Sequence, residues 1–127
     1  MAGPHELVRQ VRDLVVFKRD VDAAVELLTE DVVVEHPFGP PSVPPRIEGR
    51  EGFRAHLTRV LASSRNEFFG FEDLAVHQTT DPDVVVIECA LSGRNTETGE
   101  EFSRRYVQVI TARGGKIAHW KDYVHVG

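Results

Sequence analysis

Apolar residues recur at helical spacing in three segments of the first half of the chain. The first segment predicts a helix over residues 5–18, and Asp20 is a favourable N-cap for a second, shorter helix. A third helix is expected over about residues 50–63, directly after Gly49. The apolar positions are Leu7, Val11, Leu14 and Val15 in the first, Val21, Ala24, Val25 and Leu28 in the second, and Phe53, Leu57, Val60 and Leu61 in the third. Each helix therefore has one face that can pack against a core.

The second half of the chain has the composition of strands, because β-branched and aromatic residues dominate segments that are bounded by turn residues. The four segments are residues 67–78, 83–92, 101–112 and 116–126. Gly114-Gly115 lies between the last two and predicts a tight hairpin. Val32–Val34, which follows Asp31, predicts an earlier strand.

Helices first and an antiparallel meander last are typical of an α+β domain. The 127 residues suffice for one domain, so residues 1–127 are expected to fold as a single unit. Three helices laid on one face of a curved, mostly antiparallel sheet would leave a cone-shaped space. Such a space is a natural central pocket for a ligand.

His36 is a candidate acid or base because of its position at the start of a stiff loop. Five of the seven prolines lie between Pro37 and Pro45, where they predict an extended connection. The residue before a proline is held extended, which aims the imidazole in one direction. Histidine titrates near neutral pH, although a hydrogen-bonded structural role is the alternative.

Asp122 is the most informative candidate for catalysis. It alternates with Ala118, Trp120 and Val124 on one face of the last predicted strand. Desolvation beside an apolar face raises the pKa of a carboxyl group, which can then transfer protons near neutral pH. The alternative is a structural aspartate in an ion pair.

The register of the last hairpin decides which residues accompany Asp122. Counting back across the glycine turn places Val109 opposite Trp120 and Val107 opposite Asp122. Arg105 would then lie diagonally across from Asp122 on the same face.

Glu88 is a possible supporting residue whose face is left open by the sequence. One register of the preceding hairpin pairs Glu88 with Arg105 and creates a cluster with Asp122. A shift of one residue pairs it with Arg104 on the other face. A cross-strand ion pair without a catalytic role is the alternative for Glu88.

Charge and composition exclude several classes of function. The net charge is −5 and no segment is strongly basic, which argues against nucleic-acid and anionic-membrane binding. No apolar run is long enough to span a bilayer, and no leader segment is evident. The single cysteine, Cys89, fits a small buried group and a cytoplasmic location. No metal-ligand spacing or phosphate-binding loop occurs, so neither a metal nor another cofactor is expected.

Four polar and aromatic residues alternate onto the face opposite Asp122. They are His119, Lys121, Tyr123 and His125. Histidines at this spacing could bind a metal ion, but a solvated or subunit-contact face is the preferred interpretation.

Two segments carry a family resemblance. Val34–Pro41, followed by Gly49–Glu51, resembles the ketosteroid isomerases, and Gly114–Tyr123 resembles the C-terminal strand of limonene epoxide hydrolases and SnoaL-like polyketide cyclases. All belong to the nuclear transport factor 2-like superfamily. The resemblance implies a cone-shaped α+β barrel with one deep apolar pocket, and a homodimer formed through the outer face of the sheet.

The resemblance also implies roles for individual residues. His36 aligns with the aspartate base of the isomerases, and Asp122 aligns with the acidic residue of the hydrolases and cyclases. The oxyanion-hole tyrosine of the isomerases aligns near Arg12, and their oxyanion-hole aspartic acid near Val107 or Gln108, so these donors are not retained.

Together, these observations predict a small cofactor-free enzyme that binds an apolar, carbonyl-bearing molecule. Asp122 and His36 would catalyse acid/base chemistry such as aldol cyclisation or isomerisation. The expected pocket-lining residues are Trp120, Val107, Val109, Phe38, Phe69 and Phe71. One alternative is a non-catalytic, dimeric ligand-binding domain. Another is an epoxide hydrolase, which would need Glu88, Arg105 and Asp122 to converge on one water.

Overall fold

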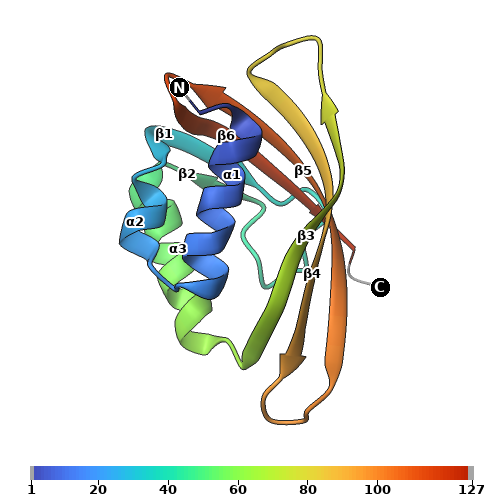
Figure 1. Cartoon of the computed structure of the whole chain (residues 1–127). Helices are drawn as coiled ribbons and strands as arrows, with labels where there is room; N and C mark the ends of the chain where they lie inside the picture. Colours follow the sequence, from blue (N-terminus) through green and yellow to red (C-terminus); the bar gives the residue numbers. More distant parts are fainter. Residues whose placement is uncertain (1, 126–127) are drawn as a thin grey trace.

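The computed structural model describes residues 2–125 and has the predicted α+β architecture, with helices first and strands last (Figure 1). The helical segments are α1 (Pro4–Arg12), its π-helical continuation η1 (Asp13–Phe17), α2 (Val21–Val25) and α3 (Arg50–Ser63). The strands are β1 (Leu28–Glu35), β2 (Arg46–Glu48), β3 (Asn66–Gln78), β4 (Val84–Asn95), β5 (Glu101–Arg113) and β6 (Lys116–Val124). No helix in this described range is long and apolar enough to cross a membrane.

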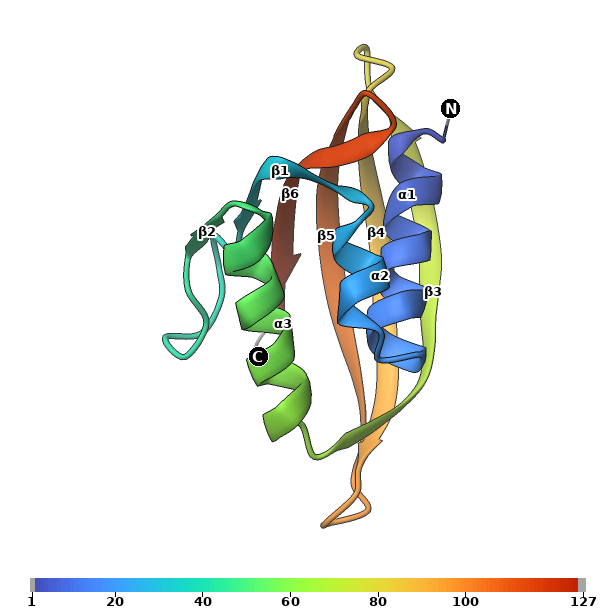
Figure 2. The same cartoon turned by 90° about the vertical axis from the view of Figure 1, so that its left-hand side faces the viewer.

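The six strands form one curved sheet in the order β2-β1-β6-β5-β4-β3. Neighbouring strands are antiparallel except β1 and β6, which are parallel. Figure 2 shows the three helices lying across the concave face, with β2 and β3 at opposite edges. The sheet is thus an open cone rather than a closed barrel, and its inner face is covered by the helices.

The core lies between the helices and the inner face of the sheet. The buried face of α1 contributes Leu7, Val8 and Val11, which recur at the predicted helical spacing. They contact the inner face of the sheet, where Ile87 of β4 and Ile110 of β5 are completely buried. This apolar packing is the main stabilising contribution to the fold, since free energy scales with the apolar area removed from water.

Local sequence signals placed most element boundaries correctly. Asp20 caps α2 as predicted, because its carboxylate accepts a hydrogen bond from the Ala23 amide at 3.1 Å. Leu28, however, begins β1 rather than extending the apolar face of α2. The short strand β2 was not predicted at all; its three residues pair with the end of β1 after the proline-rich loop.

The hairpin between β5 and β6 forms at the predicted glycines, both of which have positive φ. The predicted register beyond the turn is wrong by one residue. Thr111 pairs with His119 and Ala112 with Ile117, so Ala118 is an extra residue in a β-bulge. A single extra residue exchanges the two faces of the strand relative to its partner.

This bulge changes the neighbours of the candidate catalytic residue. Gln108 lies opposite Asp122, and Val107 lies opposite Tyr123. The expected positions of Val107 and Val109 beside Asp122 and Trp120 are therefore wrong. Val109 instead lies opposite Lys121, on the outer face of the sheet.

A glycine in β4 allows close contact with residues of the neighbouring strands β3 and β5. A Cβ atom at Gly93 would lie 2.6 Å from the Glu67 carbonyl oxygen and 2.8 Å from the Phe102 ring. Gly93→Ala is therefore expected to lower the free energy of unfolding by about 1–3 kcal/mol, since neither the Glu67 backbone nor the packed Phe102 ring can move away without loss of other contacts. Urea denaturation measures the change.

Gly70→Ala in β3 is the matched control, because nothing lies within 4 Å of its Cβ position. This variant should stay within about 0.5 kcal/mol of the parent protein. Equal destabilisation by both variants would contradict the steric explanation.

Candidate active site

A cavity of about 230 Å³ lies between the helices and the inner face of the sheet. Its wall is mainly apolar, with contributions from α1, η1, α3 and strands β3 to β6. Six charged, imidazole or amide side chains reach it: Arg12, His36, His56, Arg104, Gln108 and Asp122. A mainly apolar cavity with a few convergent polar groups is the usual form of a small-molecule site.

Asp122 presents one carboxylate oxygen to the protein and leaves the other available. Its Oδ1 accepts hydrogen bonds from the Trp120 indole at 2.6 Å and from the Gln108 amide at 2.9 Å. Among residues 2–125, no hydrogen bond reaches Oδ2. The carboxylate is therefore oriented by two donors while it retains a free oxygen for a ligand.

Burial raises the pKa of Asp122, because the surrounding protein disfavours the charged carboxylate. The hydrogen bond from Trp120, the charge of His36, the hydrogen bond from Gln108 and the charge of Arg12 each lower the pKa and offset part of this rise. The net upward direction is the one expected of a group that exchanges protons nearer neutral pH.

His36 is held at the end of β1 by the proline-rich loop. Its backbone amide donates to the Pro45 carbonyl at 2.9 Å, and its ring Nδ1 lies 3.1 Å from the Pro44 carbonyl oxygen. A carbonyl can only accept, so Nδ1 must carry the proton in this hydrogen bond. In the neutral ring Nε2 is then the acceptor, and it is the nitrogen that remains for chemistry at the cavity.

His56 of α3 is a second histidine in the cavity wall. Its ring centroid lies 5.9 Å from that of His36 and 6.2 Å from that of Phe53. Burial lowers the pKa of His56, and the nearby charges of His36 and Arg59 lower it further. A neutral His56 avoids placing two positive rings side by side.

A chain of hydrogen bonds through Arg12 and Gln108 orients Asp122. The Arg12 guanidinium is only 5% exposed and donates to the Gln108 side-chain oxygen from Nη2 at 2.7 Å and Nε at 3.2 Å. Its Nη1 binds the Asp73 carboxylate at 2.5 Å. Since arginine only donates and a carboxylate only accepts, the Gln108 amide must point its nitrogen at Asp122.

The structure brings four of the predicted site residues to this cavity. They are Asp122, His36, Trp120 and Phe71. The other expected residues lie elsewhere: Val107, Val109, Phe38, Phe69, Glu88 and Arg105. The bulge in β6 explains why Val107, Val109, Arg105 and Glu88 do not share a face with Asp122, whereas Phe38 lies in the loop after β1 and Phe69 in β3.

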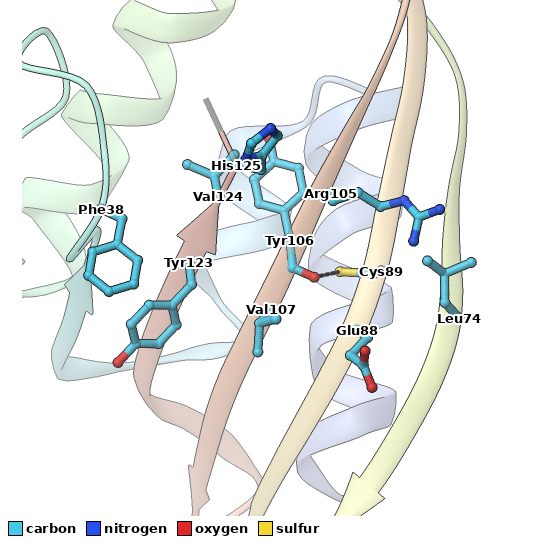
Figure 3. A pocket seen from close by; sticks show the side chains of 10 residues that line it. All are labelled: Phe38, Leu74, Glu88, Cys89, Arg105, Tyr106, Val107, Tyr123, Val124 and His125. Atoms are coloured by element: carbon cyan, nitrogen blue, oxygen red, sulfur yellow. Dashed lines mark hydrogen bonds between the residues drawn. The ribbon is translucent and has the colours of Figure 1, made fainter. Parts of the chain in front are cut away.

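Glu88 and Arg105 line a shallow hollow of about 340 Å³ on the outer face, together with Val107 and Phe38 (Figure 3). Glu88 binds His77 at 2.6 Å and lies opposite Val107. Neither residue shares a face with Asp122, so the convergence required for epoxide hydrolysis is absent and that interpretation is wrong. The outer hollow is more open than the inner cavity, and we place the candidate site in the latter.

Three cavity residues were not singled out as functional by sequence reasoning. Arg12 and Gln108 appeared only as positions where isomerase donors are missing, and His56 gave no signal. Polar residues at buried positions of α1 and β5 would have been the clue, but the register of β5 was needed to recognise them. Within the described residues, no group of three or more His, Cys, Asp or Glu side chains can hold a metal ion.

Asp122→Asn is expected to raise the melting temperature at pH 8. Because burial raises the folded-state pKa, protein stability falls as pH rises from the unfolded-state value near 3.8 through the folded value. Asparagine can keep both hydrogen bonds to Oδ1 without the desolvated charge, so the gain should shrink as the pH falls towards 4. Thermal denaturation at both pH values measures it.

The exposed Asp83→Asn variant removes one negative charge elsewhere and serves as the control. A lower melting temperature for Asp122→Asn at both pH values would show that the carboxylate stabilises the fold, contrary to this expectation.

Comparisons with known proteins identify the family to which this fold belongs. Residues 8–120 match the model of the SnoaL-like domain. An uncharacterised PhzA/B-like protein from Pseudomonas aeruginosa is 31% identical over 98 residues, which cover 77% of this chain and 67% of that protein.

Solved structures show the same fold. The crystal structure of a candidate isomerase from Bacillus subtilis is 26% identical, with a TM-score of 0.84 over 96% of this chain and 86% of that one. Rv0760c from Mycobacterium tuberculosis, crystallised with estradiol-17β-hemisuccinate, is 18% identical, with a TM-score of 0.79 over 99% and 96% of the chains. The match to the domain model covers nearly the whole described structure, and the chain belongs to the SnoaL-like family.

Proposed function

We propose that this protein binds an apolar, carbonyl-bearing small molecule in the inner cavity and catalyses cofactor-free proton transfer on it. The observation that carries the proposal is the environment of Asp122. One of its oxygens is held by two donors, and the other is available in an apolar cavity that it shares with His36. This combination suits a general base that acts on a weakly acidic C–H bond.

In the proposed step, ionised Asp122 removes a proton from the carbon next to the carbonyl group. The C–H electron pair moves to form an enolate, and the negative charge develops on the carbonyl oxygen. Protonated His36 donates from Nε2 to that oxygen, while its Nδ1 remains bound to Pro44. Return of the proton to another carbon gives isomerisation, and attack of the enolate on a second carbonyl gives aldol cyclisation.

Rv0760c supports the use of this fold for apolar ligands, because it was crystallised with a steroid ester. The apolar wall of the present cavity, with Phe53, Phe71 and Trp120, suits a ligand with a hydrophobic body. The proposal extends this binding role to the present chain and adds acid/base chemistry at Asp122.

A non-catalytic binding domain is the second candidate function. The donors of Arg12 and Gln108 are used inside the protein, on Asp73, Gln108 and Asp122, rather than aimed at a ligand. A developing enolate would then rely on His36 alone. Binding without proton transfer would favour this second function.

Proton transfer can be tested without knowing the natural substrate. The protein is incubated with 1-tetralone or 2-decanone in deuterated buffer, and loss of the α-proton signals is followed by ¹H NMR. We expect the protein to accelerate exchange above the buffer rate. Asp122→Asn should reduce this acceleration by about 10²–10⁴-fold, since it removes the general base while keeping the shape of the site.

Glu88→Gln on the outer face is the matched control and should leave exchange unchanged. Undiminished exchange in Asp122→Asn would exclude Asp122 as the base. Ketone binding, detected by quenching of the single tryptophan Trp120, without exchange would instead favour the binding domain.

We also propose that two copies of the chain associate through the outer face of the sheet. This face carries exposed apolar side chains, including Phe38, Leu74 and Val107, beside charges of both signs at Glu88 and Arg105. Figure 3 shows Phe38 against Tyr123, and their ring centroids lie 5.2 Å apart. A surface with both charges can complement a copy of itself across a twofold axis.

Val107→Glu is expected to convert the dimer to monomer, because it places a charge in the centre of this face. Light scattering coupled to gel filtration should give twice 14.2 kDa for the parent protein and 14.2 kDa for the variant. Thr98→Glu, in the exposed turn after β4, adds the same charge elsewhere and should remain dimeric. A monomeric parent protein would refute the proposal.

A further inference from the structure

We propose that the cavity contains an anion subsite at Arg104, so that the preferred ligand is an apolar molecule with an acidic group at one end. This inference rests on the proposed function insofar as it takes the inner cavity as the ligand site. It adds the chemical class of the ligand and a residue that determines specificity.

The geometry of β5 places Arg104 at the opposite end of the site from Asp122. Arg104, Tyr106 and Gln108 alternate onto the inner face, and all three line the cavity. Gln108 lies opposite Asp122 and binds it. Gln108 is four positions along the strand from Arg104, which corresponds to roughly 13 Å.

Arg104 lacks an acidic partner within the described residues, unlike Arg94 and Arg65 at the same end of the sheet. Arg94 binds Glu67 at 2.8 Å, and Arg65 binds Glu97 at 3.2 Å. Arg12, the other arginine of the cavity, is already bound to Asp73. Arg104 is thus the arginine of the cavity wall that is not bound to a carboxylate. Its guanidinium lies close enough to donate to the Tyr106 hydroxyl, which offsets part of the rise that burial causes in the pKa of Tyr106, and its other N–H groups remain for a ligand.

Aromatic contacts orient this guanidinium. Its Cζ lies 4.6 Å from the centroid of the Phe102 ring, and Phe102 packs edge-on against Phe68 in the cavity wall. Stacking on a ring occupies the planar face of the guanidinium and leaves its in-plane N–H groups free. Those groups match a carboxylate in the bidentate geometry that arginine favours.

The wall between the two charged ends is apolar and accepts the body of the ligand. It includes Leu61, Phe68, Phe71 and Leu91. A ligand with its negative group at Arg104 keeps that charge away from Asp122. The net charge of the protein is −5, so a preference for an anion must come from a local group rather than from the overall field.

The test compares 4-phenylbutyrate with 4-phenylbutanamide, which have the same phenylalkyl body and differ in charge. Both are titrated into the full-length protein at pH 7 by isothermal titration calorimetry, with Trp120 fluorescence as the second readout. The parent protein should bind the acid at least fivefold more tightly than the amide. Arg104→Gln should remove this preference and leave the affinity for the amide unchanged.

Arg105→Gln is the matched control, because Arg105 is the next residue of β5, is also exposed and points to the outer face. It changes the net charge by the same amount and should keep the preference for the acid. Equal affinities in the parent protein, or an equal loss in both variants, would overturn the subsite while the cavity remains a binding site. If neither compound bound the parent protein, the proposed ligand cavity itself would be refuted.

Discussion

The buried guanidinium of Arg12 is the interaction on which the rest of the site depends. It joins α1 to β3 through Asp73 and to β5 through Gln108. Gln108 is 2% exposed, and its side-chain amide donates a hydrogen bond to Asp122 in β6. The carboxylate of Asp122 is thereby oriented. A buried charge is tolerated only when it is paired and hydrogen-bonded, so these side chains must keep one arrangement. The same contacts that attach the helix to the sheet therefore orient the candidate catalytic carboxylate.

Only a few polar atoms in this apolar cavity are left without a hydrogen-bond partner in the described protein and can therefore bind a ligand. Arg12 donates its hydrogen bonds to Gln108 and Asp73. Asp122 accepts two hydrogen bonds at Oδ1, and its Oδ2 is available. His36 is similar, since its Nδ1 is hydrogen-bonded to the Pro44 carbonyl oxygen and its Nε2 remains available for a ligand. Because the wall around these groups is mainly apolar, each of them has a stronger electrostatic effect on a ligand than it would have in bulk solvent.

The two faces of the sheet have different proposed roles, ligand binding on the inner face and subunit association on the outer face. The inner face carries the cavity, and the outer face carries the hollow that contains Val107, Glu88 and Arg105. Neighbouring residues of β5 consequently have unrelated environments: Arg104 borders the cavity and Arg105 the outer face. The strand period of two makes this separation sharp, and it explains why single-residue register decides the chemistry available to each face.

The sequence by itself determined the α+β class, the order of the elements apart from the short strand β2, the hairpin at Gly114-Gly115 and the choice of Asp122 and His36 as candidates. These features depend on local periodicity, turn residues and side-chain chemistry. Only the tertiary structure decided that Gln108 rather than Val107 faces Asp122, and that Glu88 points away. The bulge at Ala118 depends on how β6 pairs with β5, and no local pattern specifies it. The Arg12 chain joins residues up to 96 positions apart, which only the folded chain brings together.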